Sequence, residues 1–275
     1  MSDVAAFAGA VGGISMVLTG HPFDLIKVRM QHSSNTSIVD AIRRTFHQGG
    51  KTPVAFYRGL AVPLIGVIPI MSICFGTYDA TLRAQTQGIH PPCAMNVILA
   101  GIVAGFVTGA VVSPGERLKC LLQVNNSASL VGTLRTLWKT GGVRNLYKGT
   151  IVTIGREMTG TSTFFLTNWM LRDRVFDANP SAAAIAFAGG CSGVMQWTAQ
   201  IPLDTIKSRM QTQEPLVSIG YRTVVRDIYY GVGQGRPSYV NFFNGLTPAL
   251  LRAFPASAAL FLGVEGTMAV LKLES

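Results

Sequence analysis

The sequence predicts an all-α membrane protein with six transmembrane helices, arranged as three parallel, pseudo-threefold repeats. Three features lead to this fold class: a low charge content, six apolar stretches, and a motif that recurs about every 90 residues. Only 13% of the residues are charged and 48% are hydrophobic, whereas a soluble domain is about 25% charged. The composition therefore favours a polytopic membrane protein over a soluble globule.

Six apolar stretches are long enough to cross a bilayer, which takes roughly 20 residues per helix. We expect these spans at residues 4–22, 60–79, 95–113, 150–171, 183–202 and 246–268. Each repeat holds two spans, and the repeats divide one integral membrane domain into residues 1–90, 91–180 and 181–275. Because two crossings return the chain to its starting side, the repeats share one orientation and both termini lie on one side.

The net charge of +10 is gathered on one side of the membrane. Of the 23 Lys and Arg residues, 17 follow spans one, three and five, and only four face the opposite side. This asymmetry obeys the positive-inside rule, so the termini belong to the less basic side. A basic surface facing the membrane explains the charge, and no nucleic-acid partner is expected.

Each odd span reaches a proline that is followed by an acid, a base and a glutamine at fixed spacing. The acids are Asp24, Glu116 and Asp204, the bases Lys27, Lys119 and Lys207, and the glutamines Gln31, Gln123 and Gln211. A proline removes a helix hydrogen bond and kinks the helix. If the kinked ends converge on the threefold axis, the acids and bases can pair as Asp24 with Lys119, Glu116 with Lys207 and Asp204 with Lys27. Such pairs beside an aqueous cavity are worth about 1 kcal/mol each, which suits a gate that substrate opens; stabilised helix ends are the alternative.

Small residues and a second motif complete the repeat. Glycines at a four-residue step, such as Gly9 with Gly13 and Gly101 with Gly105, predict close helix packing in lipid. The basic loops predict short amphipathic helices on the membrane surface. An aromatic–polar–glycine triplet then opens each even span: Tyr57-Arg58-Gly59, Tyr147-Lys148-Gly149 and Phe243-Asn244-Gly245.

These motifs, over essentially the whole chain, resemble the mitochondrial carrier family. The resemblance implies an alternating-access transporter of the inner mitochondrial membrane, multi-pass and monomeric, with both termini in the intermembrane space and the surface helices on the matrix side. It also implies that the motif acids and bases form a matrix gate braced by the glutamines, and that cardiolipin binds near Gly59 and Gly149. Neither a cofactor nor enzyme activity is expected, since the four histidines have no partner at metal or triad spacing.

The family's opposite gate, an aromatic–acid–x–x–base pattern on the even helices, survives here only in fragments. Asp79 lacks a base at Leu82, Trp169 stands in the acid place ahead of Arg172, and Glu265 lacks a base at Met268. One pair, Asp79 with Arg172, is the most that can be built. We therefore expect a weak outer gate.

Positions that match by repeat but differ by residue indicate where a substrate binds. Seven residues after each triplet glycine stand Gly66, Arg156 and Arg252, and Val67 and Glu157 follow the first two. Seven residues span roughly 10 Å of helix, about a third of the hydrocarbon thickness, and ionisable residues at that depth are functional candidates. The alternative is a structural ion pair between Arg156 and Glu157.

The chemistry of these positions suits a zwitterion with an apolar appendage. A substrate carboxylate suits the planar fork of Arg252, a cation suits Glu157, and span two offers an apolar wall at Gly66 and Val67. Trp197 can face a quaternary ammonium through cation–π attraction, although a packing or membrane-facing tryptophan is the alternative.

Four segments, residues 20–24, 64–69, 114–123 and 251–256, resemble the carnitine/acylcarnitine branch of the family. Glu157 after Arg156 resembles the ornithine branch instead, because the carnitine branch typically has aspartate there. A second substrate amine would need an acid on span two, and the nearest, Asp79, lies roughly 20 Å along the helix from Gly66. We therefore expect exchange of carnitine and acylcarnitines. A basic amino acid exchanger and a carrier-fold adaptor that does not transport are the alternatives.

Overall fold

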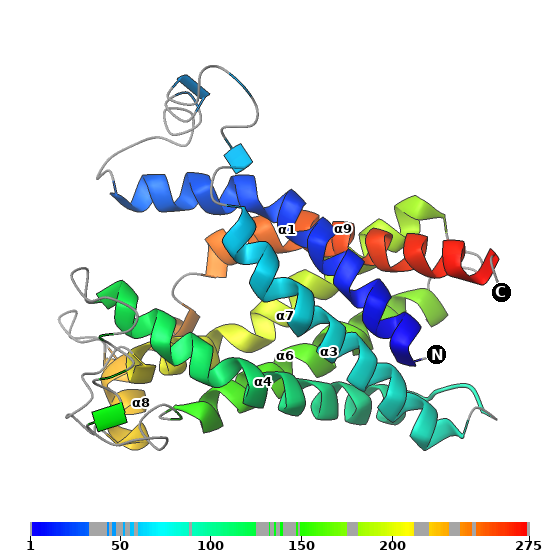
Figure 1. Ribbon diagram of the computed structural model, residues 1–275. Coiled ribbons are helices and arrows are strands. Elements are labelled where there is room, and N and C mark those ends of the chain that lie inside the picture. Colours follow the sequence, from blue (N-terminus) through cyan, green and yellow to red (C-terminus); the bar gives the residue numbers. More distant parts are fainter. Residues whose placement is uncertain are drawn as a thin grey trace.

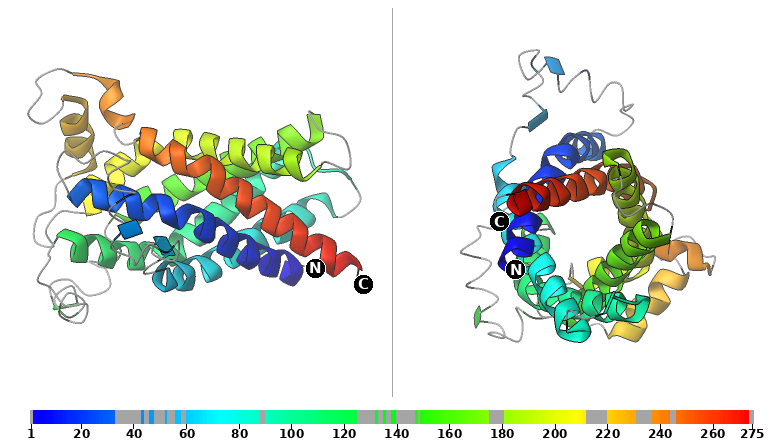
Figure 2. Two further views of the ribbon diagram at one scale, coloured as in Figure 1. Left: turned by 90° about the horizontal axis from the view of Figure 1, so that it is seen from above. Right: turned by 90° about the vertical axis from the view of Figure 1, so that its right-hand side faces the viewer.

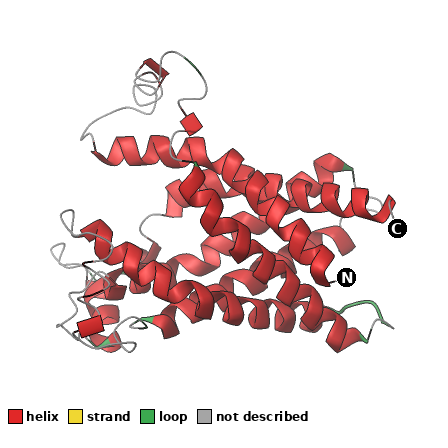
Figure 3. Cartoon of the chain, viewed as in Figure 1, coloured by secondary structure: helices red, strands yellow, loops and turns green. Residues whose placement is uncertain are grey.

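The protein is described by a computed structural model in which six long helices carry the architecture. The structure describes residues 2–32, 60–87, 90–124, 149–174, 181–211, 220–230, 237–243 and 246–273, with isolated residues between them. The long helices are α1 (Ser2–His32), α3 (Ala61–Thr86), α4 (Ala94–Val124), α6 (Thr150–Arg174), α7 (Ala182–Gln211) and α9 (Leu246–Leu273). A short helix α8 (Tyr221–Tyr230) and a 3-10 turn η2 (Tyr239–Phe243) follow α7, and every regular element in the described residues is helical (Figure 3).

The six long helices form a closed ring in chain order. Each packs against the helix before and after it, and α9 returns to α1. The end-on view shows the ring directly (Figure 2). Both termini lie at one end, which we call the terminal end, and the C-terminal ends of α1, α4 and α7 lie at the other, the motif end (Figure 1). The predicted six-helix fold of three parallel repeats is confirmed.

Four of the long helices are apolar enough to cross a membrane by length and composition alone. These stretches are Asp3–Phe23, Leu64–Thr86, Ala94–Glu116 and Ala249–Leu271. The other two helices, α6 and α7, have 25 and 30 residues but carry polar groups such as Glu157 and Gln200 that line the inside of the ring. Polar residues of a membrane protein gather at such internal cavities, which lowers the hydropathy of the helices that supply them.

Glycines allow neighbouring helices to touch. A Cβ on Gly105 of α4 would lie 2.5 Å from the carbonyl oxygen of Glu157 on α6, and one on Gly9 of α1 would lie 2.7 Å from that of Met71 on α3. Any side chain would push these helices apart, so the prediction of close packing at the glycine steps is confirmed.

The three motif prolines lie inside their helices rather than at their ends. Pro22, Pro114 and Pro202 are internal to α1, α4 and α7, which continue beyond them. A proline removes one hydrogen bond of the helix ladder, and the ribbon of α1 changes direction along its length (Figure 1). The motif residues that follow therefore remain helical.

The surface helix expected in the third repeat is α8, and it packs on the motif end of the ring. Val224 and Ile228 are buried against Ile206 of α7 and Val152 of α6. The apolar face of α8 is thus covered by the helix bundle. The amphipathic pattern of α8 resembles that of a helix on a membrane surface.

Candidate functional site

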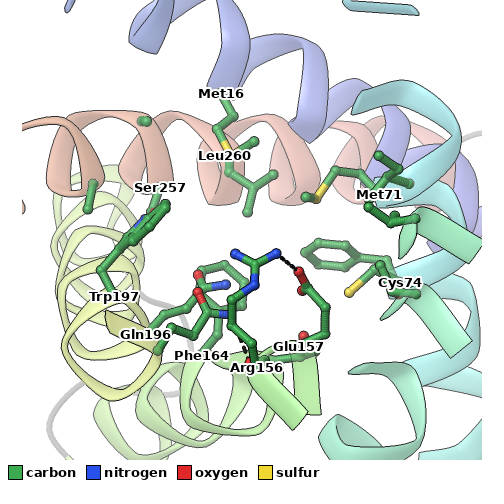
Figure 4. A pocket seen from close by; sticks show the side chains of 18 of the residues that line it. Met16, Met71, Cys74, Arg156, Glu157, Phe164, Gln196, Trp197, Ser257 and Leu260 are labelled. Atoms are coloured by element: carbon green, nitrogen blue, oxygen red, sulfur yellow. Dashed lines mark hydrogen bonds and ion pairs between the residues drawn. The ribbon is translucent and has the colours of Figure 1, made fainter. Parts of the chain in front are cut away.

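A central cavity of about 230 Å³ lies inside the ring, and all six long helices contribute to its wall (Figure 4). Its polar side chains come mainly from α4, α6 and α7, including Glu116, Glu157 and Gln196. The opposite wall is mostly apolar, with Met16 of α1 and Ile70 of α3 among its residues. The cavity is therefore two-faced, which suits a ligand with a charged head and an apolar part.

Arg156 projects into this cavity and connects three carboxylates. Its Nη2 contacts Glu157 and lies 3.3 Å from Glu116 Oε1, while Nη1 lies 3.4 Å from Asp204 Oδ1. Figure 4 shows the guanidinium beside the Glu157 carboxylate, with both side chains extending from α6 into the cavity. The residue is only 9% exposed, and its Nε has no hydrogen-bond partner among the described residues. The Arg156–Glu157 ion pair is thus present, but it belongs to a larger cluster that lines a cavity.

The motif end of the cavity contains one of the three expected acid–base pairs. Lys207 Nζ contacts Glu116 Oε2, and Lys207 is 6% exposed. Each of the other two pairs includes at least one side chain outside the description, and the side chains of all three motif glutamines lie outside it as well. The side chains outside the description are those of Asp24, Lys27, Lys119, Gln31, Gln123 and Gln211. The pairing of Glu116 with Lys207 matches the arrangement expected from the repeat, and its function as a gate stays a prediction.

The sequence reasoning missed that Arg156 also binds two of the motif acids, Glu116 and Asp204. It counted Arg156 with the substrate site and the acids with the gate. All three lie along the inner face of the ring, and the long guanidinium reaches both acids. The substrate site and the motif cluster are therefore one connected set of charges.

Gln200 of α7 is a second residue that the sequence reasoning missed. Its Nε2 donates a hydrogen bond to the backbone oxygen of Arg156 at 3.2 Å, and the residue is 2% exposed. A Cβ on Gly160 would lie 1.7 Å from that nitrogen, so Gln200 can take this position only with glycine at position 160. A glutamine in the last turn before Pro202, within a predicted membrane span, was the available signal.

Trp197 and Arg252 both line the cavity, as predicted, and they interact with each other. The guanidinium carbon of Arg252 lies 5.7 Å from the centre of the Trp197 ring, within the range of a cation–π contact. Trp197 therefore faces the cavity rather than the membrane. Its face already holds a cation that comes from the protein itself.

The prediction that Gly66 and Val67 line the cavity was wrong. Gly66 is exposed, with no atom within 4 Å of where a Cβ would stand, and Val67 packs against Gly13 of α1. The α3 wall begins one turn further on, at Ile70. For Gly66 the reason is length: the arginines at the matching positions of the other repeats reach the cavity by long side chains, and glycine has none.

An aromatic layer closes the cavity on its terminal side. Phe75, Phe165 and Phe261 occupy the same place in the three repeats, sixteen residues after each triplet glycine. The Phe75 ring lies 5.2 Å from Phe165 and 6.4 Å from Phe261, and Phe164 stacks on Phe261 at 5.0 Å. The sequence reasoning missed this layer, although counting from the triplet glycines would have found it.

Beyond the aromatic layer lies a second cavity of about 490 Å³, which we call the vestibule. The residues that line it are Ala5, Ala8, Phe75, Tyr78, Asp79, Phe165, Asn168, Trp169, Arg172, Asp173, Phe261, Val264, Glu265 and Met268. The prediction that Asp79 pairs with Arg172 was wrong. Arg172 pairs with Glu265 across the ring, and Asp79 accepts a hydrogen bond from Arg83 Nε at 2.7 Å, one turn along α3. Arg83 takes Asp79 because both lie on one helix face, so Arg172 is left to the acid of α9.

Comparison with known proteins identifies the group of relatives. The profile of the family described as "Mitochondrial carrier protein" matches residues 4–88, 91–179 and 178–275. The mitochondrial carnitine/acylcarnitine carrier protein of Homo sapiens is 34% identical over 287 residues, covering 95% of this chain and 92% of that protein. The mitochondrial carnitine carrier of Saccharomyces cerevisiae is 34% identical over 293 residues, covering 96% and 86%.

Another similar protein has a different cargo in its name. Mitochondrial magnesium exporter 1 of Drosophila melanogaster is 37% identical over 287 residues, covering 96% of this chain and 93% of that protein. Similarity to these relatives therefore does not decide the cargo of the present chain, which has to be inferred from the residues of its own cavity.

Proposed function

Since the chain belongs to the mitochondrial carrier family, we propose that it exchanges carnitine and acylcarnitines across the inner mitochondrial membrane. The observation that carries this proposal is the pairing of Arg252 with Trp197 in the same cavity as Glu157. Arg252 suits a carboxylate, while Glu157 and the Trp197 face suit a quaternary ammonium. The human and yeast relatives, which are named for carnitine, support the same substrate class.

The wall opposite these charges supports an acyl-bearing substrate. Within the described part of the chain, the α3 residues that line the cavity are Ile70, Met71, Cys74 and Phe75. None of them is a carboxylate, so a second amine would have no acid on that wall. The same wall gives an acyl chain an apolar contact, which disfavours a basic amino acid as cargo.

The charge cluster supports a mechanism for opening the motif end, which we assign to the matrix side. A substrate ammonium competes with Arg156 for Glu157, and a substrate carboxylate draws Arg252 from Trp197. The exchange at Glu157 redistributes the partners of Arg156, which also holds Glu116 and Asp204. The substrate opens the gate because it binds one arrangement of these charges better than the other.

The location of the protein and its lipid contacts are part of the proposal. Both termini then face the intermembrane space, and a monomer is sufficient because one chain completes the ring. Cardiolipin is proposed near Gly59 and Gly149. Gly149 has a φ of 87° just before α6, and a helix N-terminus of this kind attracts phosphate.

Exchange in liposomes tests the proposal. Purified protein in liposomes loaded with carnitine is expected to take up labelled carnitine, and unlabelled acylcarnitines but not ornithine should compete. Arg252→Ala is expected to abolish uptake, because it removes the group that binds the carboxylate. Leu251→Ala is the matched control, since Leu251 is the neighbouring residue on α9 and 66% exposed.

Two results would contradict the proposal. Uptake of ornithine without carnitine would identify a basic amino acid exchanger. No uptake of either compound by folded protein would favour an adaptor with a carrier fold.

A further inference from the structure

The vestibule combines aromatic rings with an excess of acids. Tyr78, Phe165 and Trp169 line it together with Asp79, Asp173 and Glu265. Among the described residues that line the vestibule, Arg172 is the single base, and it is paired with Glu265. The surroundings are therefore suited to a cation.

This acid excess follows from residues that depart from the repeat pattern. Leu82 and Met268 stand where the pattern has bases, so Asp79 and Glu265 lack the base of the pattern and pair with Arg83 and Arg172 instead. Arg83, which bonds Asp79, does not line the vestibule and its side chain is 47% exposed. Compared with the pattern, this end has fewer acid–base pairs and has a tryptophan in the acid place of α6.

A buried hydrogen-bond donor, the side-chain amide of Asn168, favours a ligand that also carries a hydrogen-bond acceptor. Asn168 lines the vestibule, is 7% exposed, and its Nδ2 has no hydrogen-bond partner within the described residues. A buried amide N–H without an acceptor is unfavourable, so a ligand that supplies an oxygen is favoured here. Tyr78 and Val264 occupy the matching positions of the other two repeats, so the donor belongs to one repeat only.

We propose that the vestibule is a second binding site, which takes a quaternary ammonium ion bearing a carboxylate or ester carbonyl before it enters the central cavity. Aromatic faces with nearby carboxylates attract a diffuse methylated cation, which has no N–H to satisfy. A primary ammonium would need several acceptors instead. The carbonyl oxygen of the ligand accepts the hydrogen bond of Asn168.

The aromatic layer makes this site separable from the central one. Phe75, Phe165 and Phe261 stand between the two cavities, and each cavity has a tryptophan of its own: Trp169 in the vestibule and Trp197 in the central cavity. The third tryptophan, Trp138, lines neither of the two. Fluorescence can therefore report each site alone.

The test uses two single-tryptophan forms of the full-length protein in detergent. Trp138→Phe with Trp197→Phe leaves Trp169, and Trp138→Phe with Trp169→Phe leaves Trp197 as the matched form. Each is titrated with tetramethylammonium chloride and with acetylcarnitine, against sodium chloride at equal ionic strength. Saturable quenching of Trp169 by both probes is expected, and it should persist when Arg252→Ala disables the central cavity.

Asn168→Leu distinguishes the contribution of the ligand's carbonyl group from that of its ammonium group. Loss of the amide donor is expected to weaken acetylcarnitine binding at Trp169 about tenfold, while tetramethylammonium changes by less than about twofold. Asp79→Asn with Glu265→Gln is expected to weaken both probes. Circular dichroism and thermal unfolding verify that each variant is folded.

Three results would overturn the vestibule site: a folded protein whose Trp169 does not respond while Trp197 does, a Trp169 response that disappears with Arg252→Ala, or equal loss of both probes in Asn168→Leu. The choice of acetylcarnitine as a probe rests on the proposed function, whereas the choice of tetramethylammonium does not. Saturable tetramethylammonium binding at Trp169 without carnitine exchange would therefore refute the proposed function and leave the vestibule site standing.

Discussion

The two ends of the central cavity are closed by different physical means. Toward the motif end, Arg156 and Lys207 hold Glu116, Glu157 and Asp204 in one charge cluster. Toward the terminal end, phenylalanines from the three even helices close the ring by packing, and ion pairs lie beyond them.

The difference predicts that the two closures respond to different kinds of change. Charged partners can be exchanged for those of a substrate without moving the helices far, because a guanidinium can change carboxylates in place. A packed aromatic layer has no such substitute and opens only if the helices separate. The motif end should therefore respond to charge changes and the terminal end to volume changes.

The largest expected effect is that of Arg156→Gln, which leaves three carboxylates in the cluster with too little positive charge. Removing one partner of a buried ion pair costs about 3–5 kcal/mol, so we expect a large fall in unfolding free energy and complete loss of exchange. Thermal unfolding measures the loss of stability, and exchange in liposomes measures the loss of transport. Adding Glu157→Gln should recover part of the stability but not the transport. An Arg156→Gln protein with normal stability would show that the cluster is not a unit.

A charge exchange between Glu116 and Lys207 comes next in size. For an isolated pair, Glu116→Lys with Lys207→Glu should restore transport lost in either single variant. Here we expect no recovery, because Arg156 Nη2 lies 3.3 Å from Glu116 Oε1 and would face the new lysine. Exchange rates of both singles and the double variant decide the matter, and full recovery would reduce the cluster to a simple pair.

Phe165→Ala tests the terminal end through volume. The ring contacts Phe75 and stacks on Tyr78 at 3.6 Å, so its removal should cost about 3 kcal/mol and open the layer. Cys74, which is 8% exposed and lines the central cavity, is the reporter. In a form with the other three cysteines changed to serine, labelling of Cys74 by a hydrophilic maleimide should rise several-fold.

The control for this experiment is Phe106→Ala, a ring that is 53% exposed on α4. It should leave the labelling rate of Cys74 unchanged. If Phe165→Ala also leaves the rate unchanged, the aromatic layer is not the barrier on that side.

The smallest effect is expected for Arg172→Ala. The side chains of Arg172 and Glu265 are 33% and 31% exposed, so solvent screens their pair and the cost should stay below about 1 kcal/mol. Exchange should fall by less than about fivefold. Thermal unfolding of Arg172→Ala and Arg156→Gln, measured side by side, compares their losses of stability. Equal losses of stability in the two variants would mean that both ends are closed by charge.

Much of the architecture could be read from the residues in order. Helix length, the four-residue glycine step and the recurrence of the proline motif depend on local geometry, which is the same in every repeat. Counting along an even helix also places Arg156 and Arg252 at equal depth, because the rise per residue of a helix is constant. The same symmetry led to the Glu116–Lys207 pair.

The partners of the remaining charges and the true cavity wall could not be read in this way. Arg172 meets Glu265 rather than Asp79, and Arg156 joins two motif acids to Glu157, because long side chains choose among neighbours that become adjacent only when the ring closes. Gly66 is at the right depth but has no side chain to reach the interior. Sequence thus determined the helices, the repeats and the depth of the site, whereas contacts across the ring decided which charges pair and where the cavity begins and ends.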